Sequence, residues 1–266
     1  MLPSVFGKVV HDQWRATLAW SVGASVLAAF YLALYPSLGG LAEMQTMLDA
    51  MPPELRAFFA GEGFDLATPA GYLNIELFSF VLPLVVAGYG VAVGSAAIAG
   101  EEERGTLDLL LANPVPRWRV VIEKSIAMLV GIVVLVGAIW IGLALTSLAM
   151  DIDLDLGLVA SGLTSGALLG MVIGALALAL GSITGRRTLS LAVAMVVLVV
   201  TYVINAMSAL VEGLEAWRPI SPVYHYVGYD PLNNGIDPAH ASVLVAMTLV
   251  GIAVAVLAFE RRDVRG

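Results

Sequence analysis

Hydrophobic residues are concentrated in six long runs separated by polar stretches. The runs cover residues 16–35, 73–99, 125–148, 156–184, 189–211 and 241–259. About 20 apolar residues in a helix cross a bilayer core of about 30 Å, whereas a barrel would show short alternating strands. The pattern therefore predicts an all-α integral membrane protein with six transmembrane helices, folded as one domain over residues 1–266.

Composition agrees with a membrane environment. Hydrophobic residues make up 59% of the chain and charged residues 13%, against about 45–50% and about 25% in soluble domains. Cysteine is absent and His11, His225 and His240 are scattered, which excludes disulfides and the usual metal-ligand motifs. The first run exceeds the roughly 7–15 apolar residues of a signal peptide, so we expect it to remain as a span.

Basic residues indicate which loops face the cytoplasm. With the N-terminus inside, all of the 13 Lys and Arg residues except Arg56 and Arg218 fall on the cytoplasmic side. Because Lys and Arg favour cytoplasmic loops, both termini are expected in the cytoplasm. The net charge of −8 comes from acids in the outer loops, which we interpret as a solvated surface.

A short amphipathic stretch precedes the first run. Residues 1–15 place Val5, Val9 and Trp14 at near-helical spacing among polar residues. This spacing is typical of a helix that lies in the membrane interface. A plain continuation of the first span below the membrane is the alternative.

The fourth run carries the strongest packing signal. Four glycines recur at every fourth residue: Gly162, Gly166, Gly170 and Gly174. Such a stripe lets a second helix approach closely where lipid provides no hydrophobic drive. Helix packing within one chain, a subunit interface and a sliding surface all use this pattern. Gly90 and Gly94 in the second run form a shorter example.

Ionisable side chains are rare inside the runs. Glu76 is the one carboxylate at membrane depth, and Asn74 and Asn205 are neutral polar candidates. Ion-coupled carriers need such groups at depth, so their scarcity disfavours a secondary transporter or channel. The three residues are candidates for a translocation path, and anchoring of Glu76 at the outer interface is the alternative.

The segment 100–119, between the second and third runs, is the most structured polar part of the sequence. Thr106 is a candidate N-cap, Asp108 suits the positive end of a helix dipole, and Asn113-Pro114 ends the helix. These residues alone are equally consistent with a turn on the membrane surface and with a docking helix for a soluble partner.

Residues 101–119 resemble the loop signature of type-2 ABC exporter permeases, in which acidic residues precede Gly-Thr, then Leu-Leu, Pro and Arg. The resemblance implies a short coupling helix seated on a cytoplasmic ATPase, and half-length re-entrant helices within residues 212–240. An ordinary loop is the alternative for residues 212–240, because they contain several prolines and Asn233-Asn234-Gly235. The docking residues that it implies are Glu101, Glu103, Arg104, Gly105, Thr106, Leu107, Asp108 and Leu110.

The sequence contains no GxxxxGK[ST] motif, so the chain lacks a P-loop for ATP hydrolysis of its own. The resemblance therefore implies that ATP and Mg²⁺ bind to a separate ATPase subunit. It also implies a permease homodimer in the cell membrane of a prokaryote, with no cofactor or metal on this chain and no nucleic-acid partner.

An intramembrane enzyme is the second rival function. Such an enzyme needs a nucleophile with a base, or paired acids, at membrane depth, and Ser182 and Ser190 have no such partner in the pattern. We therefore predict no catalytic residue. The transported substrate does not follow from the sequence, because lipid requires apolar walls whatever the cargo.

Overall fold

The structure is a computed structural model that describes residues 5–38, 46–47, 50–52, 68–107, 115–208 and 211–262. The long helices are α1 (Val5–Leu34), α5 (Leu82–Ala97), α8 (Arg117–Met150), α9 (Leu156–Thr184), α10 (Arg187–Met207) and α14 (Pro238–Arg261). The second span also includes α4 (Pro69–Leu73) and the π-helix η2 (Asn74–Val81), which precede α5. Within the described residues, six helices are long and apolar enough to cross a membrane, which confirms the all-α fold and the six spans.

Helices α1, α8 and α14 extend beyond their apolar runs at their charged ends, whereas α10 ends at Met207, before the predicted end of its run at 211. The fourth span agrees with its run, 156–184. The third span begins at Arg117, ahead of the run at 125–148, because residues 117–124 continue the helix past the apolar stretch. Hydrophobicity alone therefore located each span but not its charged first turns.

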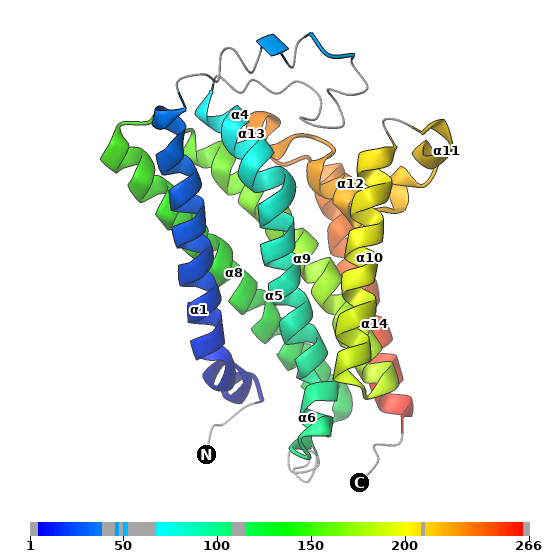
Figure 1. Cartoon of the computed structure of the whole chain (residues 1–266). Coiled ribbons are helices and arrows are strands. Elements are labelled where there is room, and N and C mark those ends of the chain that lie inside the picture. Colours follow the sequence, from blue (N-terminus) through cyan, green and yellow to red (C-terminus); the bar gives the residue numbers. More distant parts are fainter. Residues whose placement is uncertain are drawn as a thin grey trace.

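Helix α9 lies in the middle of the bundle (Figure 1). Helix α5 packs along α9, α14 and α10 also contact α9, and α1 pairs with α8. Helix α1 begins and α14 ends at the same end of the bundle, which we call the terminal end. The opposite end holds the short helices between α10 and α14, which are α11 (Glu212–Glu215), η3 (Arg218–Ile220), α12 (Pro222–Val227) and α13 (Pro231–Asn234).

Helix α1 runs without a break from Val5 to Leu34. Its first turns, for which the sequence predicted an interfacial helix, continue directly into the span. They are attached to α8, because the Phe6 N–H donates to Glu123 Oε2 over 2.7 Å, and Val5 and Val9 are buried. Placement of these turns in the membrane interface stays a prediction.

Glycines hold α5 and α9 in close contact. A Cβ on Gly90 would lie 2.3 Å from the carbonyl oxygen of Gly170, and one on Gly94 would lie 2.2 Å from that of Gly174. We call these four residues the glycine seam. Because the neighbouring atoms belong to the backbone, a larger residue would have to displace a whole helix. The stripe on α9 is thus a packing surface within one chain.

The other half of the stripe receives side chains. Gly162 leaves room for Phe78 and Leu232, and Gly166 leaves room for Leu82. This half of α9 therefore contacts both η2 and the short helices beside it.

Candidate functional site

Helix α6 (Ala99–Glu103) follows the second span after Ile98 and lies at the terminal end. It ends in a Schellman motif, in which the Gly105 N–H donates to the Glu102 carbonyl and the Thr106 N–H to the Glu101 carbonyl, each over 2.9 Å. Gly105 has a left-handed φ of +66°, which glycine adopts without strain. The Gly-Thr pair of the loop signature therefore terminates α6.

Glu101 points back into the bundle. Its Oε2 lies 2.6 Å from Nζ of Lys124 on α8, and its Oε1 lies 3.9 Å from Nζ of Lys8 on α1. Lys124 is only 1% exposed and also donates to the carbonyl of Ala97 at the end of α5. Because Glu101 precedes the loop and Lys124 follows it, this buried pair closes the base of the loop.

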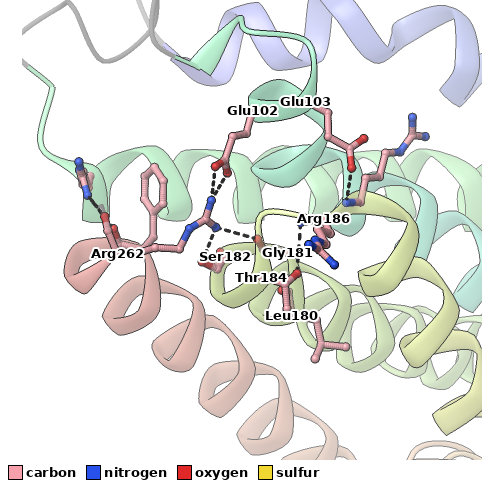
Figure 2. Close-up of polar contacts among 11 residues, drawn as sticks. Glu102, Glu103, Leu180, Gly181, Ser182, Thr184, Arg186 and Arg262 are labelled. Carbon is pink, nitrogen blue, oxygen red and sulfur yellow. Dashed lines mark hydrogen bonds and ion pairs between the residues drawn. The ribbon is translucent and has the colours of Figure 1, made fainter. Parts of the chain in front are cut away.

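Glu102 binds Arg262, the residue that follows α14 (Figure 2). The same guanidinium donates to the carbonyls of Ser182 over 3.0 Å and Gly181 over 3.4 Å. Both carbonyls belong to the last turn of α9, where a cation also interacts favourably with the helix dipole. Arg262 therefore joins α6, α9 and α14.

Glu103 contacts the start of a further helix. Its Oε1 accepts the N–H of Arg187, the first residue of α10, over 2.8 Å (Figure 2). A carboxylate at the N-terminus of a helix accepts from a backbone N–H that has no partner within the helix, and its negative charge interacts favourably with the helix dipole. The preceding turn is fixed as well, because Thr184 Oγ1 accepts the Arg186 N–H over 3.2 Å and donates to the Leu180 carbonyl over 2.7 Å.

The acidic triplet, Glu101, Glu102 and Glu103, thus connects the end of the second span to all the other spans at the terminal end. The sequence predicted that Glu101 and Glu103 face a partner protein. The structure places their carboxylates against the chain itself, and a role of these two residues in docking stays a prediction.

The remaining residues of the loop signature divide by exposure. Arg104 and Gly105 are exposed, whereas Leu107 is 1% exposed and packs in a small apolar cluster at the terminal end. The side chain of Leu107 therefore faces the bundle. Asp108 and Leu110 lie outside the described residues.

Sequence reasoning missed the partners of the acidic triplet. It used Lys8, Lys124 and Arg262 only as signals of topology. A physical hint was present, because three successive carboxylates at the C-terminal end of a helix oppose the helix dipole and require nearby cations.

The three candidate path residues lie in different surroundings. Asn74 is buried and its Nδ2 donates to Oδ1 of Asp230 over 2.8 Å, whereas Glu76 is exposed on the other face of η2. Asn205 Oδ1 accepts from Nε of Arg218 over 3.4 Å. The three residues thus have separate surroundings, and the described residues hold no cluster of three or more His, Asp or Glu for a metal ion.

Residues 222–234, which carry α12 and α13, pack against η2 and α9. The Tyr226 hydroxyl donates to the carbonyl of Phe78 over 2.6 Å. Burial raises the pKa of this phenol far above its ordinary value, so the hydroxyl keeps its proton and stays a donor. The resemblance implied half-length re-entrant helices in this region. The structure has the short helices α12 and α13 here, and their re-entry into the membrane stays a prediction.

A family model described as ABC-2 family transporter protein matches residues 4–264. The chain belongs to this family. A search of curated proteins finds no match. As an ABC-2 permease, the chain is the membrane component of an ABC transporter and is not itself an enzyme, which confirms the resemblance noted in the sequence. Membership implies an ATP-binding partner subunit and a lipid bilayer.

Proposed function

We propose that this ABC-2 permease is half of an ATP-driven exporter that docks a separate cytoplasmic ATPase through the loop after α6. Two copies would form the translocation path as a homodimer in a prokaryotic cell membrane, with both termini in the cytoplasm. ATP and Mg²⁺ would bind the partner subunit. The Glu101–Lys124 pair carries the proposal, because it joins the two ends of this loop and so holds the second and third spans together at its base.

This arrangement would transmit motion of the ATPase directly to the membrane helices. A loop with a loose base would absorb the motion of a partner, whereas a base held by buried charges moves together with the helices. Glu102, through Arg262, and Glu103 extend this connection to α9 and α10. Movement of the ATPase at Arg104 and Gly105 would therefore reach the centre of the bundle.

We propose that Glu76, Asn74 and Asn205 line the translocation path. A carboxylate in a span normally faces protein or water instead of lipid. Since Glu76 is exposed on the single chain, a second copy or a water-filled path would supply its surroundings. The runner-up function is a secondary transporter or channel, which would need no ATPase.

Orientation is tested by labelling single cysteines in intact cells. The sequence has no native cysteine, so Asp153→Cys and Arg186→Cys each provide one reactive thiol. Both positions are exposed and lie at opposite ends of the bundle. We expect an impermeant maleimide to label Asp153→Cys in intact cells and Arg186→Cys only after permeabilisation. The reverse result would contradict the cytoplasmic placement of the loop.

Docking is tested by reversing an exposed charge at the start of the loop. Arg104→Glu should weaken association with the ATPase subunit about tenfold, because charge reversal in an interface costs affinity. Thermal stability of the purified permease should stay unchanged, since Arg104 is exposed. Copurification and thermal unfolding are measured on the same preparations.

The matched control for docking is Arg15→Glu, an exposed reversal on α1 away from the loop. It should leave copurification intact. Equal retention of the ATPase by Arg104→Glu and Arg15→Glu would contradict docking through this loop. Absence of any ATPase from the parent complex would favour the secondary transporter.

A further inference from the structure

The π-helix η2 leaves the backbone carbonyl of Phe78 without a helical donor. The Leu82 N–H donates to the Leu77 carbonyl, five residues back. In an α-helix the same N–H would serve Phe78. The next donor along the chain would be residue 83, which is proline and has no N–H. The carbonyl of Phe78 therefore has neither of the donors that the second span could supply.

Tyr226 supplies the missing donor from a distant part of the chain. Its hydroxyl lies 2.6 Å from the Phe78 oxygen, and its side chain is 2% exposed. A buried hydroxyl that loses its partner is costly, as is a buried carbonyl. Each group therefore satisfies the other only while η2 keeps its π geometry.

A second contact supports the same geometry. The Asn74 side chain, at the start of η2, donates to Asp230 at the start of α13. Phe78 also fits over Gly162 beside Leu232 of α13. The buried face of η2 is thus held by the segment 222–234 and by α9.

An α-helical register would place the outer half of the span differently. Phe78 would take the position that Leu77 now holds, and Leu77 would take that of Glu76, a rotation of about 100°. In that register the Ser79 carbonyl would face Pro83 and lack a donor, and the Tyr226 hydroxyl would lose its acceptor. The choice of register therefore decides whether Glu76 or Leu77 occupies the exposed position.

We propose that Tyr226 is a positioning residue that selects the π register of the second span and so presents Glu76 on the exposed face. The consequence for transport rests on the proposed function, because Glu76 acts in transport only if it lines a translocation path. The selection of register is a property of this chain alone, and its test needs neither an ATPase nor a substrate.

The test uses the reactivity of Leu77→Cys in purified, folded protein. Leu77 is 2% exposed, so its thiol should react slowly with a small maleimide. In Tyr226→Phe the Phe78 carbonyl has no donor in the π register, whereas the α register gives it the Leu82 N–H. The α register should therefore become populated and labelling should speed up. Adding Pro83→Ala gives the α register its missing donor and should complete the shift, with a rise in rate of about tenfold or more over the parent as the thiol becomes exposed.

Two controls separate register from general loosening. Tyr224→Phe, two residues away on α12, should leave labelling unchanged. Pro83→Ala with Tyr226 intact should also leave Leu77→Cys protected, because the hydroxyl still favours the π register. A thiol at Glu76→Cys, reactive in the parent, should not gain reactivity in the Tyr226→Phe background.

Protection of Leu77→Cys in folded Tyr226→Phe would overturn the proposal. So would a shift by Pro83→Ala alone that equals that of the double variant, because proline and not tyrosine would then set the register. If Tyr226→Phe does not purify as folded protein, Asn74→Leu cuts the second contact instead. The same rise at Leu77→Cys is expected there, and unchanged protection would again contradict the proposal.

Discussion

Replacing Gly94 with alanine is expected to remove most of the folded protein. The new Cβ would lie 2.2 Å from the Gly174 oxygen and 3.2 Å from the Leu178 nitrogen, both backbone atoms. Neither can rotate away as a side chain would, so α5 and α9 must separate. Overpacking a tight core costs about 3 kcal/mol, and here it also breaks the dispersion contacts that drive helix association in lipid. Thermal unfolding and yield of monodisperse protein in detergent measure the loss.

The matched control is Gly137→Ala on α8, where a Cβ would meet no atom within 4 Å. Alanine favours a helix over glycine by up to about 1 kcal/mol, so this variant should be as stable as the parent or slightly more stable. The two identical substitutions should therefore change stability in opposite directions. Unchanged folding of Gly94→Ala would show that α5 and α9 do not touch through the glycine seam.

Removing the ammonium of Lys124 is expected to have the second large effect. Lys124→Met leaves the Glu101 carboxylate buried beside an apolar side chain, with Lys8 at 3.9 Å as its remaining ion-pair partner. Breaking a buried ion pair by deleting one partner costs about 3–5 kcal/mol. Because the pair closes the base of the loop, the variant should also lose the ATPase during purification, while Arg104→Glu loses the ATPase alone.

The double variant distinguishes a coupled pair from two separate effects. Combining Lys124→Met with Glu101→Gln removes both charges, so the unfolding temperature should recover most of the loss. A double variant that loses the sum of the two single effects would contradict the pair. Thermal unfolding of the four proteins supplies this comparison.

Hydrophobic periodicity predicted the spans because lipid imposes it directly. Each of the six helices contains a long unbroken run of apolar residues, which fits a helix in a bilayer and not the short alternating strands of a membrane barrel. The four-residue spacing of Gly162, Gly166, Gly170 and Gly174 likewise predicted a stripe on which a second helix can approach the backbone closely. The partner of this stripe could not be predicted, because the pair Gly90 and Gly94 is too short to differ from chance on its own.

The acidic triplet shows what a sequence pattern cannot predict. A row of carboxylates predicts that cations lie nearby, but it does not say whether those cations belong to a partner or to the same chain. Lys124 and Arg262 are separated from the triplet along the sequence and meet it only after α8 and α14 have packed. In the folded chain Arg104 is exposed and can contact a partner, whereas Glu101 is buried against Lys124.

The π-helix was beyond prediction for a similar reason. Asn74–Val81 has the composition of an ordinary apolar helix, and Pro83 marks only a missing donor. What selects the π register is a hydroxyl that lies 148 residues further along the chain. Local propensity contains no information about such a contact.

The most direct measurement of the central claim is photo-crosslinking from the exposed start of the loop in living cells. A photoreactive amino acid at Arg104 should form a crosslink to a protein that carries a P-loop ATPase motif, because this loop is proposed to lie on that subunit. The same amino acid at Asp153, at the opposite end of the bundle, should form no such crosslink. Crosslinks from position 104 to lipid alone, in cells that assemble the ATPase complex, would contradict docking through this loop.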